Sequence, residues 1–201
     1  IRLSLVGSEM CIRDRIITEN WLEEMLQLCQ QKDVGMVGAK LYYPDDTIQH
    51  AGVVVGLGGV AAHVLCKLPR DAEGYMGRLR CVQEISAVTA ACMMVKTSVF
   101  KAVGGFDEEL KVAFNDIDLC MKVRKYGVKI VFTPYAELYH YESKSRGMED
   151  TPEKQLRFSR EVNCFRRKWE RELLKGDPYY NPNLTLNNTD CSLRKQEKNG
   201  D

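Results

Sequence analysis

Two aspartates at the start of an expected helix are the residues best suited to chemistry. Asp116 and Asp118 lie in the segment FNDID, residues 114–118, which opens a stretch with helical apolar periodicity up to residue 126. A helix N-terminus stabilises negative charge by about 0.3–1 kcal/mol, so the segment fits an N-cap followed by an acidic first turn. A positioned aspartate also fits a general base that takes a proton from an attacking hydroxyl. The residues alone leave both interpretations open.

A second polar cluster follows the strand expected at residues 128–132. The loop YHYESKSRG, residues 139–147, holds one imidazole, several hydroxyls and two cations within nine positions. Such groups suit an anion like a diphosphate, or a metal ion bound to it. A single histidine after a strand is also commonly structural, so the cluster leaves both roles open.

The segment GLGGVA, residues 56–61, formally matches the G-x-G-x-x-G/A pattern of dinucleotide-binding proteins. That site needs a helix to open at the glycines and an acidic residue about 20 positions later, at the end of a second strand. Pro69 and a polar loop come too early, so we expect a glycine-rich loop between two strands. His50 and His63 flank this loop, and the sequence identifies no partner for either.

The composition is typical of an ordinary globular protein. Of 201 residues, 44% are hydrophobic and 28% are charged, and the net charge of +1 gives no electrostatic reason to expect nucleic acid as a partner. No apolar run approaches the roughly 20 residues of a membrane-spanning helix. The eight cysteines are scattered, without the close pairs of a disulfide framework or a zinc site, which favours a reducing cytoplasm.

Strand and helix patterns alternate along the chain, which predicts an α/β fold. The expected helices cover residues 20–31, 97–104, 116–126 and 153–175. The expected strands cover residues 34–43 and 52–57, two runs within 82–95, and residues 128–132. Pro134 is expected to end the last strand, because proline cannot donate to a sheet ladder. Asn20 and Glu23 have the spacing of a capping box at the first helix.

The first fifteen residues, IRLSLVGSEMCIRDR, are predicted not to be native. Residues 4–15 resemble the translated adapter of a transposase-fragmented sequencing library, and they lack the unbroken apolar stretch of a secretory signal. The sequence therefore predicts three segments: read-through over residues 1–15, a folded domain over 16–184, and a polar flexible tail over 185–201.

Several ordered motifs resemble the family 2 glycosyltransferases of the GT-A fold, in their bacterial surface-polysaccharide branch. They include DVGMVGAKLYYPDDTIQHAGVVVGLGG, SAVTAACMMVKTSVFKAVGGFDEEL, FNDIDLCMKVRKYG and TPYAELYHYESKSRG. The resemblance implies a GT-A-type mixed sheet flanked by helices, of which residues 16–184 are the C-terminal part, with a long C-terminal helix and a polar tail. The family's D-x-D half would precede Ile16, so we expect the fragment to lack most of the donor site and to be inactive alone.

The resemblance also implies roles for individual residues. Asp116 matches the catalytic base and Asp118 the acidic residue beside it, while Asn115 stands where many members carry a glutamate. His140 matches a residue that contacts the nucleotide diphosphate or its metal, which would be Mg²⁺ or Mn²⁺. The other residues expected to contact substrate are Asn115, Ala90, Ala91, Ser143, Ser145 and Arg146.

The implied reaction transfers a hexosyl or rhamnosyl group, with inversion, from a nucleoside diphosphate sugar to a glycan or lipid-linked acceptor. The protein would be cytoplasmic, and its acceptor would bring it to the cytoplasmic face of the inner membrane as a peripheral protein. Two other classes stay open. One is a non-catalytic carbohydrate- or partner-binding module, which Asn115 and the missing donor half would allow. The other is an NAD-dependent oxidoreductase that uses residues 56–61.

Overall fold

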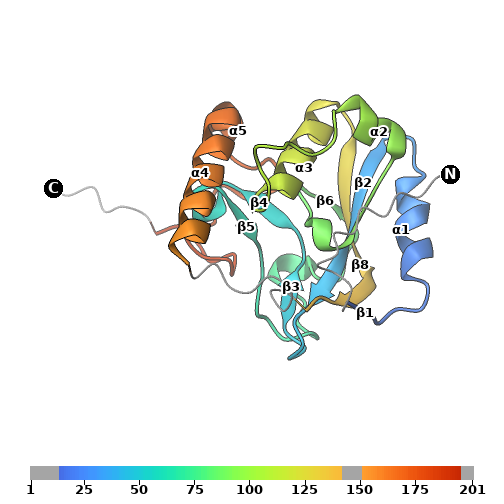
Figure 1. Ribbon diagram of the computed structural model, residues 1–201. Helices are drawn as coiled ribbons and strands as arrows, with labels where there is room; N and C mark the ends of the chain where they lie inside the picture. The colour runs from blue at the N-terminus through green and yellow to red at the C-terminus, as the bar shows by residue number, and fades with distance from the viewer. Residues whose placement is uncertain (1–13, 142–150, 196–201) are drawn as a thin grey trace.

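The computed structural model describes residues 14–141 and 151–195, which form one mixed six-stranded sheet, a separate two-stranded hairpin and several helices (Figure 1). Strands β1, β8, β2 and β3 are neighbours in that order, and β6 and β7 pair with β8 and β2 respectively. The sheet strands are β1 (Arg15–Ile16), β2 (Val34–Tyr42), β3 (Ile48–His50), β6 (Gln83–Glu84), β7 (Met93–Val95) and β8 (Lys129–Tyr139).

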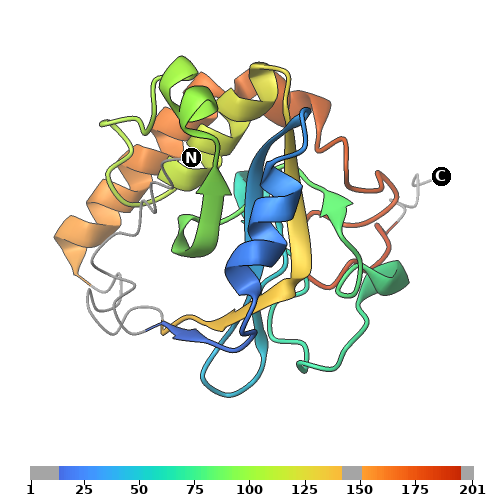
Figure 2. The same ribbon diagram turned by 90° about the vertical axis from the view of Figure 1, so that its right-hand side faces the viewer.

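The parallel pair β2 and β8 forms the centre of the core. All nine residues of β2 are buried, as an apolar run covered on both faces requires. Helix α1 (Trp21–Cys29) covers one face of this pair, and α3 (Asn115–Lys125) packs against the other face (Figure 2). The structure thus confirms the predicted α/β architecture, a mixed sheet flanked by helices.

Strand β8 does not end near Pro134, so that part of the sequence prediction is wrong. In the ladder with β2, Gly38 faces Phe132 and Lys40 faces Glu137, so several extra residues of β8 lie between these two pairs. This bulge places Pro134 where the ladder is interrupted and no N–H is needed. The strand therefore continues to Tyr139, which lies beside the last residue of β2, Tyr42.

The glycine-rich segment is a loop between strands, as expected. β4 (Val53–Val55) and β5 (Ala61–His63) pair antiparallel, and a short 3-10 turn at Leu57–Gly59 joins them. Gly56 and Gly59 adopt φ of 96° and 83°, which suits glycine. No α-helix opens at these glycines, and the neighbouring strand is antiparallel. The dinucleotide-binding interpretation therefore fails on geometry.

The long C-terminal helix is divided, which the apolar stripe did not predict. α4 (Pro152–Lys168) and α5 (Glu170–Lys175) are separated at Trp169, whose φ of −115° is not helical. Trp169 is buried at this break. The Thr151 hydroxyl caps the start of α4 by accepting the Lys154 N–H.

The start of α1 also differs from the sequence prediction. The Asn20 side chain makes no capping hydrogen bond, so the expected capping box is not formed.

The end of α2 (Thr97–Ala102) agrees with the sequence prediction, because Gly104 and Gly105 follow it and both have positive φ. None of the helices described here is long and apolar enough to cross a membrane.

Part of the predicted flexible tail is packed onto the fold. The Leu65 N–H donates to the Thr189 carbonyl at 2.6 Å, and the Thr185 N–H donates to the Ser192 carbonyl at 2.8 Å. Cys191 is buried. Part of the segment predicted to be a polar flexible tail thus makes backbone contacts with the fold, and residues 196–201 lie outside the described part of the chain.

The predicted boundary after residue 15 lies inside β1. Arg15 faces Tyr139 and Ile16 faces Leu138 in an antiparallel pair with β8. The described end of the segment predicted to be read-through is thus paired with the sheet, and residues 1–13 lie outside the described residues.

Candidate active site

Three elements bring predicted site residues to one edge of the sheet. β7 runs antiparallel to β2 with Met93 opposite Gly38, so the 3-10 turn Ala90–Cys92 lies toward the carboxyl end of β2. β8 runs parallel to β2, and His140 follows its last residue at the same end. α3 begins at Asn115 beside the Ala90 turn. Ligands of open α/β sheets bind outside the carboxyl ends of the strands, and this edge is therefore the candidate active site.

Asp116 is held in place by backbone groups from two elements. Its Oδ2 accepts the Ala90 N–H at 3.0 Å, and its Oδ1 accepts the Ile117 N–H at 2.9 Å. The Asn115 amide oxygen accepts the Asp116 N–H at 2.7 Å. The Asp116 residue remains partly exposed. The structure thus brings together Asn115, Asp116 and Ala90, with Ala91 next to them.

The residue before α3 has an unusual backbone conformation. Phe114 adopts φ of 62°, the left-handed region that few non-glycine residues occupy. Its ring packs against Phe158 and Phe165 of α4, with ring centroids 5.9 and 5.3 Å apart. Strained residues persist only where the surroundings hold them, and α4 provides that support immediately before Asp116.

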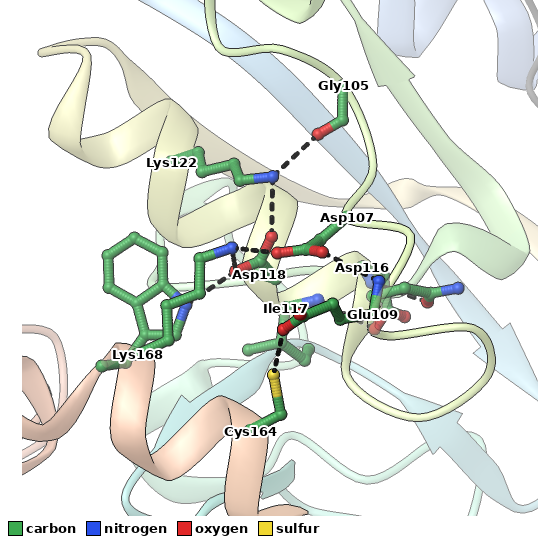
Figure 3. A network of polar contacts seen from close by, with 11 residues as sticks. Gly105, Asp107, Glu109, Asp116, Ile117, Asp118, Lys122, Cys164 and Lys168 are labelled. Atoms are coloured by element: carbon green, nitrogen blue, oxygen red, sulfur yellow. Dashed lines mark hydrogen bonds and ion pairs between the residues drawn. The ribbon is translucent and has the colours of Figure 1, made fainter. Parts of the chain in front are cut away.

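Asp118 occupies a different environment from Asp116. Its side chain is 0% exposed, and its two oxygens lie 2.8 Å from Lys168 Nζ and 2.9 Å from Lys122 Nζ (Figure 3). The Trp169 indole also donates to Oδ1 at 2.8 Å. The carboxylate is enclosed by the cations of α3 and α4 and presents no surface to a substrate. Asp118 therefore has a structural position between α3 and α4, and the catalytic role expected of it stays a prediction.

One face of α4 holds the loop that precedes α3, residues 107–114. Glu161 accepts the backbone N–H groups of Val112 at 3.1 Å and Ala113 at 2.9 Å. The Cys164 thiol donates to Glu109 at 3.3 Å, and Lys168 binds Asp107 (Figure 3).

Residues 161, 164 and 168 of α4 follow the i, i+3, i+7 spacing of one helix face, and we call them the α4 clamp. The Lys168 hydrogen bond holds the pKa of Asp107 below its usual range. Sequence reasoning missed these residues. The sequence did show that these polar residues have helical spacing beside the apolar stripe of the helix. That pattern does not identify the residues that they contact.

Replacing Glu161 by Gln is expected to lower the free energy of unfolding by about 1–3 kcal/mol, as urea denaturation would measure. Glu161 is 3% exposed and uses both oxygens, whereas an amide has only one acceptor oxygen, so one partly buried N–H loses its partner. The matched control is Glu23→Gln on exposed α1 surface, which should leave stability unchanged. Equal stability of the Glu161 variant and the wild type would contradict this role.

His140 is paired with a carboxylate. Its Nδ1 lies 2.9 Å and 3.0 Å from the two oxygens of Asp14, and Asp14 also accepts the Tyr141 N–H at 3.3 Å. The His140 backbone N–H donates to the Tyr42 carbonyl at 3.0 Å, which fixes the residue to the end of β2. The sequence prediction assigned no role to Asp14. Three other predicted contacts, Ser143, Ser145 and Arg146, lie outside the described residues.

His50 and His63 are partners of each other. Their Nδ1 atoms lie 2.9 Å apart, with His50 at 0% exposure. Burial, and then the charges of His63 and His140, hold the pKa of His50 well below its usual range. His50 is therefore neutral at physiological pH. The described residues contain no group of three or more His, Cys, Asp or Glu side chains arranged to hold a metal ion on their own.

Residues 13–161 match the family model described as "Glycosyltransferase like family 2". The chain is 57% identical over 179 residues to the uncharacterized protein y4gI of Sinorhizobium fredii, covering 89% of this chain and 20% of that protein. It is 38% identical over 187 residues to the O-antigen biosynthesis protein RfbC of Myxococcus xanthus, covering 92% and 14% respectively. An N-acetylglucosaminyl-diphospho-decaprenol L-rhamnosyltransferase of Mycobacterium tuberculosis is 36% identical over 62 residues, covering 31% and 20%. The chain thus spans at most 20% of the length of these relatives.

Proposed function

This chain belongs to glycosyltransferase-like family 2, and from that premise we propose that the protein transfers a sugar from a nucleoside diphosphate sugar to an acceptor hydroxyl. Its mixed sheet flanked by helices is consistent with the GT-A fold. The observation that carries the proposal is the partly exposed Asp116 carboxylate, oriented by two backbone N–H groups at the carboxyl edge of the sheet.

The proposed mechanism is a single displacement with inversion. Asp116 takes the proton of the acceptor hydroxyl while that oxygen forms a bond to the anomeric carbon of the donor. The bond from this carbon to the diphosphate breaks on the opposite face, and the electron pair leaves with the diphosphate. The N–H groups of Ala90 and Ile117 fix the direction of the carboxylate, which favours the geometry of attack.

A divalent metal ion, Mg²⁺ or Mn²⁺, is part of the proposal. His140 lies at the same edge, where Asp14, a residue of the segment predicted not to be native, is paired with its Nδ1, and an imidazole nitrogen fits an ion that is completed by substrate phosphates. His140 would contact the ion or the diphosphate bound to it, and the ion would supply positive charge to the leaving diphosphate. The side chains are 14% and 13% exposed, so both remain partly accessible.

The acceptor class is proposed from the names of the relatives. One is named for O-antigen biosynthesis and another as a rhamnosyltransferase acting on a lipid diphosphate sugar. We therefore propose a surface-polysaccharide glycan or lipid-linked saccharide as acceptor, and a hexosyl or rhamnosyl donor. The protein would work in the cytoplasm, at the cytoplasmic face of the membrane that holds a lipid-linked acceptor.

The test is an assay on the protein with the natural sequence that flanks this segment in its gene. Radiolabelled UDP-hexoses and dTDP-L-rhamnose are supplied with lipid-linked and free saccharides. We expect donor-dependent transfer of label, release of the nucleoside diphosphate, and an inverted anomeric configuration by NMR. Saccharide binding without release of nucleoside diphosphate would instead establish the non-catalytic module, which Asn115 in place of an ionisable residue would suit. A retained anomeric configuration would contradict the single displacement.

A further inference from the structure

Lys40 is a buried cation in the middle of β2. It is 4% exposed, and its ammonium donates a hydrogen bond to the Leu79 carbonyl at 3.2 Å. Within residues 14–141 and 151–195, no carboxylate forms an ion pair with it. An ammonium has three N–H groups, and buried charges are normally paired, so Lys40 has unused capacity for an anion.

The carboxylate nearest in the ladder is already engaged by other groups. Glu137 faces Lys40 across β2 and β8, but its Oε2 lies 3.0 Å from Arg70 and its Oε1 accepts the Tyr42 hydroxyl. Arg70 and Lys40 both lie over the Tyr42 ring, 5.0 and 5.4 Å from its centroid. The aromatic face offsets part of their charge, and Arg70 is also paired with Glu137 and, at 3.6 Å, with Asp46, so Lys40 is the cation of this pair without an ion-pair partner among the described residues. Burial lowers the pKa of Lys40, as expected where the ammonium has no full counter-ion.

These cations face a cavity. A cavity of about 670 Å³ is lined by Lys40, Arg70 and Arg80, together with Thr18, Leu79 and Tyr135. A second cavity, of about 550 Å³, shares Arg70, Asp71 and Glu137 with the first, and its other charged lining residues are the carboxylates Asp45 and Asp46. None of the residues placed in the candidate active site lines either cavity, although Arg70 and Asp46 of the cavity lining contact the hydroxyl of Tyr139, the residue before His140.

We propose that this cavity binds a phosphate-bearing small molecule, with the Lys40 ammonium as its buried anchor. Lysine acts as a point charge toward phosphate, and guanidinium groups add directed N–H donors. Arg80 is available for this role, because its ion pair with Glu73 is exposed on both sides, at 60% and 69%. Three cations against the carboxylates of Asp71 and Glu137 leave the first cavity with a net positive charge.

The test titrates the chain with sodium pyrophosphate, at constant ionic strength and without divalent metal, and follows backbone amides by NMR. We expect saturable shifts at Lys40, Leu79 and Arg80. Lys40→Met should weaken binding by about tenfold or more, since a charge-assisted contact is lost. Lys101→Met, an exposed lysine on α2, should bind as the wild type does. Lys40→Arg should keep most of the affinity.

Three outcomes would overturn the proposal. The first is a wild-type shift pattern centred on His140 rather than on the cavity. The second is unchanged affinity in Lys40→Met. The third is binding of acetate as tight as that of pyrophosphate, which would make the cavity a carboxylate site. The amide shifts of the wild-type chain do not depend on any variant. If the Lys40→Met chain failed to fold, the location of the wild-type shifts and the comparison with acetate would therefore still decide the proposal.

Discussion

Replacing Asp116 by Asn is expected to lower the rate of sugar transfer by about 10²–10⁴-fold, the usual contribution of a general base. An amide has nearly the same shape but cannot take the proton of the acceptor hydroxyl. The fold should survive, because Asp116 is partly exposed and the amide oxygen can still accept one of the two backbone N–H groups. Stability should fall by about 1 kcal/mol or less.

The measurement is the initial rate of transfer and of nucleoside diphosphate release at saturating donor. A base acts in the transition state, so kcat should fall while KM for the donor stays near its wild-type value. Glu108→Gln is the matched control, since it removes an exposed carboxylate from the loop before α3. If Asp116→Asn kept full activity while Asp118→Asn lost it, the assignment of the base would be wrong.

Replacing Asp118 by Asn is expected to lower the free energy of unfolding by about 3 kcal/mol. The carboxylate is 0% exposed and faces two ammonium groups at 2.8 and 2.9 Å. A neutral amide leaves Lys122 without its carboxylate partner, while Lys168 keeps its ion pair with Asp107. Their side chains are 20% and 31% exposed, so water relieves part of the cost and keeps it near the lower end for a broken buried pair.

Urea unfolding followed by tryptophan fluorescence would measure this loss, with Trp169 as a reporter next to the substituted group. The control is Asp33→Asn, which breaks an ion pair of the same 2.8 Å length whose partners are 60% and 47% exposed. Exposed pairs contribute little, so that variant should unfold like the wild type. An equal loss of unfolding free energy in the two variants would show that the burial of Asp118 does not increase the contribution of its ion pairs to stability.

The strongest parts of the fold were predictable because their patterns are local. The apolar run of β2 and the periodicity of α3 each determine an element without reference to the rest of the chain. Pro134 misled because a bulge, set by the pairing with β2, removes the need for its N–H. Trp169 misled because an apolar residue at helical spacing does not reveal that the helix breaks there.

The site shows the same limit. The proximity of Asp116 and Ala90 followed from the resemblance, and the structure places the Ala90 N–H on the Asp116 carboxylate. The division of roles between Asp116 and Asp118 had a local signal, since residues two apart on an α-helix point about 200° apart. The residues that cover Asp118 could not be inferred from the sequence, because Lys168 and Trp169 lie about 50 residues further along the chain.

The α4 clamp has a consequence for synthesis of the chain. Its contacts with residues 107–118 join groups that are 48 to 61 positions apart. At about 5–20 residues per second, the ribosome needs roughly 2–12 s to make that interval. During this time the Glu161 acceptor of the Val112 and Ala113 amides has not been made, nor has Lys168, one of the two cations beside Asp118. The loop that leads to Asp116 therefore reaches its final shape only after the later helix has been synthesised and has docked.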